Sequence, residues 1–362
     1  MPFNDTRVPV SIVYVTCRKD PKFYWFLASL KNELKGDYSW VEVIIVDFWK
    51  ETRSCRVPIR KHLGKDCRFI HTPPKPSVWQ GSNRLTKENY FAAANARNTG
   101  IAFAQYANIC FVDDLSVLVP GWFDKLQEGL KQSKILLGVY GKGSSMVVKK
   151  GVIEKAVVEG PNNDHRIEIL EKRHGEEGAK NWNPCTGDWL FGCCFAMPLD
   201  YLLDCNGLDE NSDSEGSEDA LLGAILERRH EDAFRISTAF KILEAHDEHF
   251  DGHVFHRQIK KRLSFDRKAA YLAGNDSAFT PEYIAMRTHH HGPPEQWEWD
   301  SSHEMLYRTK YDLQTATVNS NYFPEGGLRD LRDRVLVEGY DAFPKDQIPQ
   351  HDWRDGQPLS EM

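Results

Sequence analysis

Two adjacent aspartates, Asp113 and Asp114, directly follow a short apolar run that we expect to be a buried strand. Neighbouring carboxylates repel each other unless a cation or hydrogen-bond donors neutralise them, so the pair is costly without a purpose. A divalent metal held by such carboxylates acts as a Lewis acid on a leaving diphosphate. A second acidic pair, Glu218 and Asp219, could supply a general base for an attacking hydroxyl. The alternatives are a cap or solvated turn for the first pair and favourable charge at a helix N-terminus for the second.

The segments around these carboxylates alternate between strand-like and helix-like patterns. The apolar runs predict strands at 10–16, 41–46, 67–71 and 108–112, and helical spacing predicts helices at 23–34, 88–107 and 218–229. This order predicts a doubly wound, mostly parallel α/β sheet flanked by helices. Such sheets bind ligands at the carboxyl ends of their strands, where Thr16, Arg18, Asp47 and Asp113 lie.

The later part of the chain is less regular. Residues 135–148 and 239–245 contain strand-like pieces, whereas the polar stretch 160–187 suggests a long functional loop over a site. Beyond 254 the character changes to a basic segment at 257–268 and a Trp/Tyr-rich, Pro-interrupted remainder. We therefore expect one domain over 1–254 and a C-terminal, partly helical extension over 255–362 that serves the acceptor side, a lid or oligomerisation.

Composition indicates an ordinary soluble globular protein of 362 residues, with 41% hydrophobic and 27% charged residues. The formal net charge of −7 argues against a surface that binds nucleic acid non-specifically. The N-terminal residues lack the features of a signal peptide, and no apolar run approaches the ~20 residues of a membrane span. The 8 cysteines show no CxxC or zinc-ligand spacing, so we expect reduced thiols and a cytoplasmic location.

Four motifs in a fixed order make the assignment more specific. Residues 94–102 read ANARNTGIA, 109–114 read ICFVDD, 119–122 read VPGW, and 207–210 (GLDE) precede the Glu218-Asp219 pair. Together with the first two strands, they resemble family-2 GT-A glycosyltransferases over about residues 8–250. The resemblance implies a GT-A fold, which is Rossmann-like, with a mostly parallel central sheet.

The resemblance also implies roles for individual residues. It assigns Asp47 to the nucleobase, Arg97 and Asn98 to the nucleotide, Asp113 with Asp114 to metal and diphosphate, and Asp219 to the general base with Glu218 as the fallback. Thr16 and Arg18 join the same nucleotide-sugar site. A turn former at a strand end remains the alternative for Asp47, and a helix-surface ion pair is the alternative for Arg97.

The chain departs from the family at its metal motif. Leu115 stands where the second metal-binding aspartate of a DxD motif belongs, so the ligands of Mn²⁺ or Mg²⁺ must be Asp113 and Asp114, with the Ser116 hydroxyl as a further candidate. Relatives often add a histidine ligand, and His246 is closest to the strand-like run that ends at residue 245.

An acceptor side is implied by Asp188 and Trp189. An aromatic face packs well against the C–H face of a sugar, and a neighbouring carboxylate can hold hydroxyl groups. Core packing is the alternative for Trp189.

The implied activity is inverting transfer from a nucleotide-diphosphate sugar, by family base rates a UDP-sugar, to a hydroxyl of a glycan, a lipid-linked sugar or a small molecule. A second hypothesis changes the acceptor to a modified nucleic-acid base, motivated by the basic segment 257–268. A third, a nucleotidyltransferase or a non-catalytic sugar-nucleotide-binding module, is disfavoured because residues 16–20 contain no glycine and the carboxylates are all present.

Overall fold

The central element is a mixed sheet of ten strands within the described part of the chain. The computed structural model describes residues 7–18, 20–50, 62–76, 92–157, 163–210, 218–245, 321, 323 and 326–343. The strands are β1 Val10–Thr16, β2 Val41–Asp47, β3 Arg68–Thr72, β4 Asn108–Asp113, β5 Ser116–Leu118, β6 Ile135–Lys149, β7 Val152–Val157, β8 Asn183–Pro184, β9 Cys194–Pro198 and β10 Phe234–Ala245.

The strand order is β3-β2-β1-β4-β9-β6-β10-β5, with β7 beside β6 and β8 beside β10. The neighbours β3, β2, β1 and β4 are all parallel, and β10 is parallel to β6. Strands β9 and β5 run antiparallel to their neighbours. The predicted α/β class with a mostly parallel sheet is therefore confirmed.

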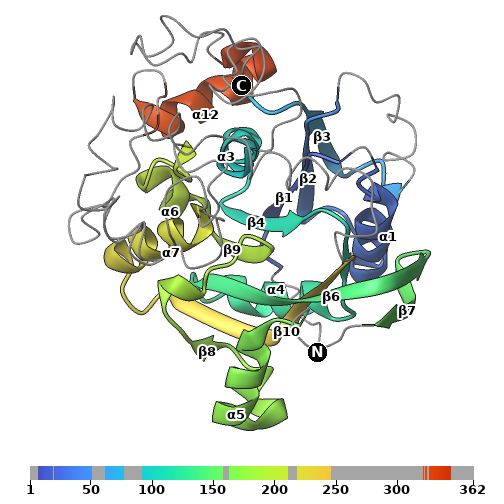
Figure 1. The fold of residues 1–362 in the computed structure, drawn as a ribbon. Helices are drawn as coiled ribbons and strands as arrows, with labels where there is room; N and C mark the ends of the chain where they lie inside the picture. Colours follow the sequence, from blue (N-terminus) through green and yellow to red (C-terminus); the bar gives the residue numbers. More distant parts are fainter. Residues whose placement is uncertain are drawn as a thin grey trace, which may run out of the picture.

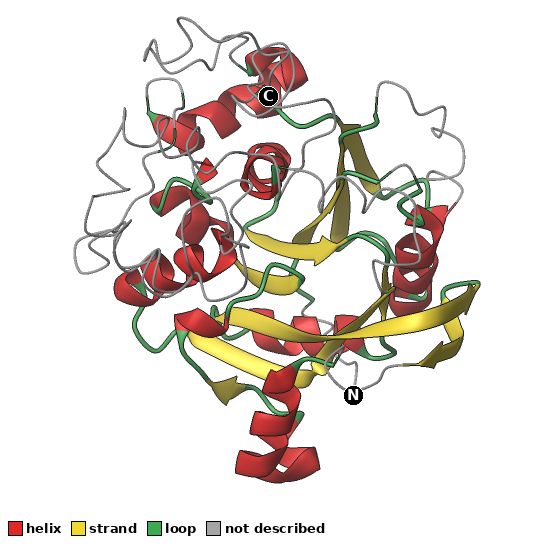
Figure 2. Cartoon of the chain, viewed as in Figure 1, coloured by secondary structure: helices red, strands yellow, loops and turns green. Residues whose placement is uncertain are grey.

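Helices cover both faces of this sheet (Figure 1, Figure 2). Side chains of α1 (Phe23–Leu34) and α4 (Trp122–Leu130) pack in one core cluster. Those of α3 (Ala93–Phe103), α6 (Leu199–Asp204), α7 (Glu218–Arg229) and α12 (Gly327–Glu338) pack in the cluster on the other face. The remaining helical elements are α5 His165–Ala179, η3 Gly187–Trp189 and η8 Gly339–Ala342.

Strand β1 shows why the apolar run at the start of the chain is unbroken. Its side chains alternate between the two faces, with Ile12 and Tyr14 in the α1/α4 cluster and Val13 and Val15 in the α3 cluster. Every residue of β1 is buried, as expected of a central strand covered on both sides.

One prediction about this architecture was wrong. The polar stretch 160–187, expected to be a loop, contains α5, a helix of 15 residues with a non-helical residue at Gly175. Its N-cap residue Asp164 accepts a hydrogen bond from the Arg166 backbone N–H. Most residues of α5 are exposed and polar. The few buried apolar positions form a pattern too short to indicate a helix.

Part of the predicted C-terminal extension packs on the sheet-forming domain. Helix α12 lies beside α3 (Figure 1), and Leu328, Leu331 and Val335 share a core cluster with α3. The predicted boundary at 254/255 falls outside the described residues. None of the helices in the described ranges combines the length and the apolar character needed to cross a bilayer.

Candidate active site

The carboxyl ends of three neighbouring parallel strands bring the predicted residues to one edge of the sheet. Thr16, the last residue of β1, is in register with Asp47, the last residue of β2. On the other side of β1, Val15 is in register with Asp113, the last residue of β4. The parallel topology therefore places the nucleotide and metal candidates side by side, as expected for this class of sheet.

Asp114 is held by two side chains at the end of β1. The Thr16 hydroxyl donates to one carboxylate oxygen at 2.7 Å, and the Arg18 Nε donates to the other at 2.9 Å. The Arg18 backbone N–H donates to the Thr16 hydroxyl at 3.1 Å. Thr16 and Arg18 thus lie beside the acidic turn, where both were predicted, and they orient its second carboxylate.

The residue after Asp113 and Asp114 takes an unusual backbone conformation. Leu115 has φ +57°, a region that costs a residue with a branched side chain about 1–2 kcal/mol. Its N–H donates to the Tyr14 hydroxyl at 3.0 Å, and Tyr14 donates to the carbonyl of Pro21 at 2.9 Å. Leu115 is buried beside Val117. At the second DxD position, the chain therefore has an apolar anchor for the acidic turn.

Arg97 of α3 bridges the two acidic pairs. Its Nη2 donates to Asp113 at 2.9 Å and its Nη1 donates to Glu218 at 2.7 Å. Burial alone would lower the pKa of this guanidinium, but the charges of Asp113, Glu218 and Asp219 outweigh burial and raise it. Arg97 is thus a buried, permanent cation, and the alternative of a surface ion pair is wrong.

Gly192 links Arg97 to the second acidic pair. Its carbonyl accepts from Arg97 Nη2 at 3.2 Å, and its N–H donates to Asp219 Oδ2 at 2.7 Å. A Cβ at this position would lie 2.4 Å from Arg97 Nη2, so a side chain here would displace the guanidinium. The absence of a side chain at Gly192 therefore lets Arg97 and Asp219 share one backbone segment.

The carboxyl group of Asp113 has a raised pKa. Burial is the largest cause; the Arg97 charge opposes it, and the Asp114 charge adds to it. A carboxyl group with these neighbours binds a proton more readily than an isolated aspartate. Asp113 is thereby distinguished electrostatically from a carboxylate in a solvated turn.

Asp47 is fully buried and oriented by two donors. Its Oδ1 accepts from the Trp49 backbone N–H at 2.9 Å, and its Oδ2 lies 3.0 Å from His71 Nε2. The Trp49 indole N–H donates to the Cys17 carbonyl at 2.7 Å. The indole therefore bridges the ends of β1 and β2 next to the residue predicted to bind the base.

Asn98 and Ser116 are directed into the protein. Asn98 is completely buried and exchanges hydrogen bonds with Leu208, and its amide also donates to Glu210 at 2.8 Å. The Ser116 hydroxyl, likewise buried, donates to the Asp114 carbonyl at 3.3 Å. Both side chains stabilise the backbone around the site.

The predicted acceptor residues lie on η3. Asp188 is exposed, and Trp189 is partly buried, with the Arg173 guanidinium 5.6 Å from its ring centroid. The buried Arg166, ion-paired to Asp164, donates to the Trp189 carbonyl. This contact fixes the backbone of the segment that continues to Gly192.

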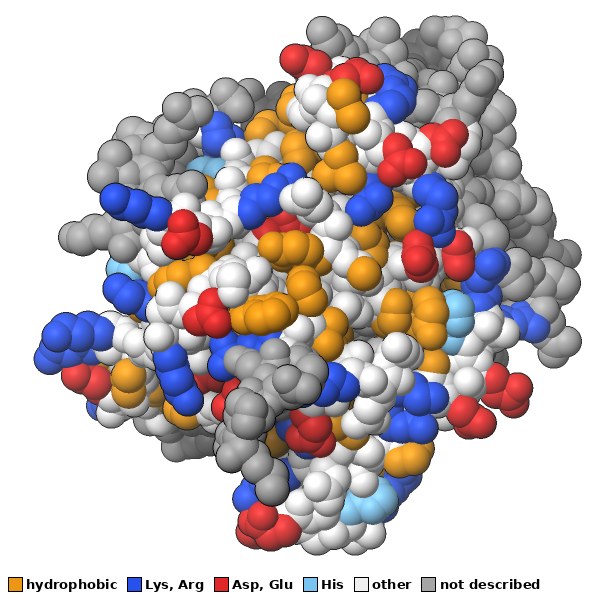
Figure 3. Space-filling view, turned by 180° about the vertical axis from the view of Figure 1, so that it is seen from behind, with side chains coloured by type: hydrophobic (Ala, Val, Ile, Leu, Met, Phe, Trp, Pro, Cys, Tyr) orange, Lys and Arg blue, Asp and Glu red, His pale blue; other side chains and the backbone are white. Residues whose placement is uncertain are grey.

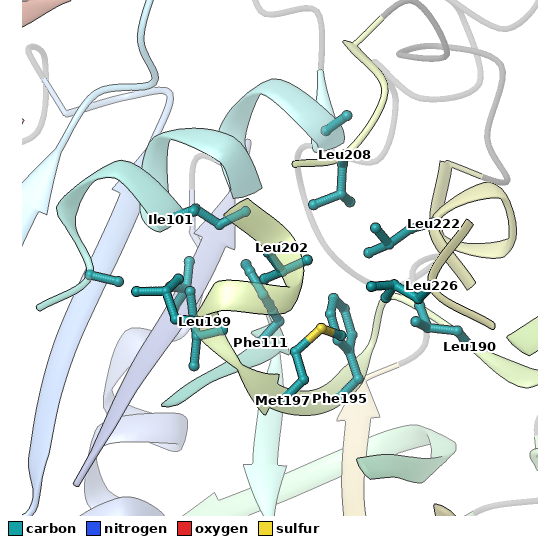
Figure 4. Packing of buried hydrophobic residues seen from close by; sticks show 14 of the residues in the cluster. Ile101, Phe111, Leu190, Phe195, Met197, Leu199, Leu202, Leu208, Leu222 and Leu226 are labelled. Carbon is teal, nitrogen blue, oxygen red and sulfur yellow. The ribbon is translucent and has the colours of Figure 1, made fainter. Parts of the chain in front are cut away.

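One core cluster supports the elements of the site. In Figure 4, side chains from α3 (Ile101), β4 (Phe111), the segment before α7 (Leu208) and α7 itself (Leu222, Leu226) gather around the same space. The two acidic pairs are thus mounted on elements that share a single apolar core.

No group of three or more potential metal-ligating side chains occurs within the described ranges. The predicted third ligand, His246, lies outside them. Its predecessor Ala245 donates its backbone N–H to the Leu115 carbonyl at 3.2 Å. The end of β10 is therefore bonded directly to the acidic turn.

Tyr14, His71 and Gly192 contribute to the site without having been singled out from the sequence. His71 carried a weak signal, because it ends the expected strand that follows Asp47. Tyr14 and Gly192 act through contacts with residues distant in sequence, which local patterns do not reveal. Vicinal Cys193 and Cys194 are free thiols.

No family model matches the sequence, and no curated protein matches it significantly. Among solved structures, the chain is similar to S. aureus TarS 1–349, with 11% identity and a TM-score of 0.44 over 93% of this chain and 89% of that one. The complex of the same protein with UDP gives a TM-score of 0.45. GalNAc-T7 with UDP, GalNAc and Mn²⁺ is similar at 11% identity and a TM-score of 0.44, over 77% of this chain and 53% of that one. Similarity at this level does not indicate what this chain binds.

Proposed function

We propose that this protein is a metal-dependent glycosyltransferase that moves a sugar from a nucleotide-diphosphate sugar, a UDP-sugar, to an acceptor hydroxyl. The observation that carries the proposal is the gathering of two acidic pairs around Arg97 and Arg18 at the carboxyl ends of β1 and β4. Carboxylates in such number at a ligand-binding edge suit a reaction that needs both a divalent cation and a general base. Cys193 and Cys194, whose thiols are free although adjacent, favour a reducing compartment, so we place the reaction in the cytoplasm.

Asp113, Asp114 and His246 would hold the metal, Mn²⁺ or Mg²⁺. Carboxylate oxygens are the ligands that these cations prefer, and the bond from Ala245 to Leu115 brings the chain that leads to His246 to the acidic turn. When bound, the cation would neutralise the charge that develops on the leaving diphosphate. Ser116 is a weaker candidate ligand, since its hydroxyl donates to the Asp114 carbonyl.

Asp219 is better suited than Glu218 to act as the general base. Glu218 is almost completely buried and its carboxylate is held in an ion pair with Arg97, so it is poorly placed to reach an acceptor hydroxyl. Asp219 is more exposed and accepts from the neutral Gly192 N–H. Asp219 would take the proton from the acceptor hydroxyl while the oxygen attacks the anomeric carbon opposite the diphosphate, which inverts the configuration.

The remaining residues would bind the two substrates. Asp47, with Trp49 beside it, would contact the nucleobase, and Thr16 and Arg18 would line the nucleotide-sugar site next to Asp114. Asp188 and Trp189 would contact the acceptor from η3. Asn98 would act indirectly by holding the segment before α7.

Calorimetric titration of UDP with and without Mn²⁺ tests the proposal. We expect UDP to bind in the presence of Mn²⁺ and the Asp113→Ala variant to lose at least about tenfold in affinity, because a charge-assisted contact contributes about 1.5–3 kcal/mol. The exposed Asp333→Ala on α12 is the matched control and should bind like the wild type. Equal UDP affinity of Asp113→Ala and wild type, with no effect of Mn²⁺ on either, would contradict the metal assignment.

A further inference from the structure

The C-terminal part of the chain contacts the backbone that leads into α7. Asn321 donates from Nδ2 to the carbonyls of Asn206 at 2.8 Å and Leu208 at 2.6 Å. Its Oδ1 accepts from the Glu210 N–H at 2.8 Å. One asparagine therefore satisfies three backbone groups of the segment 206–210, the GLDE motif with its preceding residue.

Asn98 of α3 holds the same segment from the other side. It exchanges hydrogen bonds with Leu208 and donates to Glu210 Oε1, while the buried Lys75 donates to Glu210 Oε2 at 2.8 Å. The Leu208 carbonyl thus accepts from both asparagines. These contacts clamp segment 206–210 between α3 and Asn321.

The neighbour of Asn98 on α3 is Arg97, which holds Asp113 and Glu218. Consecutive residues of one helix therefore fix the GLDE segment and the first residue of α7. Helix α12 supports α3 as well, since Arg332 Nε donates to the Ala104 carbonyl at 2.9 Å and Leu331 is completely buried in the shared core. The C-terminal contacts act on the same helix that positions the catalytic acids.

We propose that Asn321 is a positioning residue for the transfer: by closing the clamp on segment 206–210, it fixes Glu218 and Asp219 relative to Asp113. This inference rests on the proposed function for its kinetic consequence, although the positioning itself is a structural property. Small misplacements of reacting groups by distant changes lower rates up to about 100-fold. The residues proposed to bind the donor lie at the ends of β1 and β2, whereas the clamp joins α3 and Asn321 to segment 206–210.

The test compares Asn321→Ala with Arg329→Ala. Arg329 lies on α12 next to Leu328, whose N–H donates to Asn206, but its own side chain makes exposed ion pairs with Asp200 and Asp204. We expect Asn321→Ala to lower kcat about 10- to 100-fold per folded molecule, with UDP affinity unchanged, and Arg329→Ala to match the wild type. A kcat equal to that of the wild type, or a parallel loss of kcat and UDP affinity, would overturn the proposal.

A second measurement is independent of activity. The Gly192 N–H donates to Asp219, so its hydrogen exchange reports whether Asp219 is held in place. We expect faster exchange of this amide in Asn321→Ala and unchanged exchange in Arg329→Ala. If the wild type binds no nucleotide and transfers no sugar, the proposed function fails while this readout still decides the positioning role. Asn321→Ser, whose shorter side chain removes these contacts and adds no charge, replaces Asn321→Ala if that variant does not fold.

Discussion

At the scale of single residues, Arg97 connects acids from two different elements. Its side chain is only 4% exposed, and it is the ion-pair partner of both Asp113 and Glu218. Removing one partner of a buried pair leaves a charge without compensation, which costs more than the pair contributes. Arg97 therefore has a structural role in addition to the role in the site that we propose for it.

Arg97→Met should lower the free energy of unfolding by about 3–5 kcal/mol and abolish donor turnover. Urea denaturation checks the first effect, with Arg329→Met as the control. Arg329 lies on α12 and its ion pairs are exposed. Their loss should therefore lower the free energy of unfolding by at most about 1 kcal/mol. Equal denaturation midpoints for the two variants would show that Arg97 is not part of a stabilising network.

Individual site residues were predictable to different degrees. Asp113, Asp114 and Arg97 stand in motifs with recognisable order, and the structure brings all of them to one edge of the sheet. Gly192 and Tyr14 were not predictable, because their importance depends on which side chains the fold brings next to them. The residues next to Gly192 and Tyr14 in the sequence do not indicate these contacts.

At the scale of elements, α7 is positioned by direct backbone contact with η3. A Cβ on Gly223 would lie 1.9 Å from the Gly187 carbonyl oxygen, and a Cβ on Gly187 would lie 2.2 Å from that of Gly223. Two glycines thus let the helix that carries Asp219 approach the segment that carries Asp188. The proposed base and the proposed acceptor residues are set relative to each other by this contact.

Gly223→Ala should push α7 away from η3, lower the free energy of unfolding by about 1–3 kcal/mol and reduce turnover. Gly178→Ala is the matched control, since it makes the same change in another helix, where the new Cβ would meet only the His174 Cβ, at 3.1 Å. Thermal unfolding and turnover should change little in that control. A Gly223→Ala protein as stable and active as Gly178→Ala would refute this account of α7.

Helices and strands were predictable where burial produces a long apolar pattern in the sequence. Strands β1 and β2 are buried along their whole length, so their sequences are continuous apolar runs. Helix α5 buries only Arg166, Ile167, Leu170 and Ala179, so the sequence of this helix reads as a polar loop. The sequence therefore predicts the buried elements of the fold better than the exposed ones.

At the scale of the whole molecule, α12 packs on the sheet-forming domain through α3. The face seen in Figure 3 carries basic and acidic side chains interspersed with hydrophobic ones. Mixed charge of this kind differs from the single-sign surfaces that bind nucleic-acid backbones. The basic segment 257–268, which motivates the nucleic-acid hypothesis, lies outside the described residues.

Donor turnover followed by NMR tests the central claim most directly. UDP-sugars are incubated with the protein and Mn²⁺, with water or an added alcohol as acceptor, and early spectra report both UDP release and the anomeric configuration of the product. We expect metal-dependent release with inverted configuration, slowed about 10²–10⁴-fold in Asp219→Asn. A product with retained configuration, or an Asp219→Asn protein as active as the wild type, would contradict it.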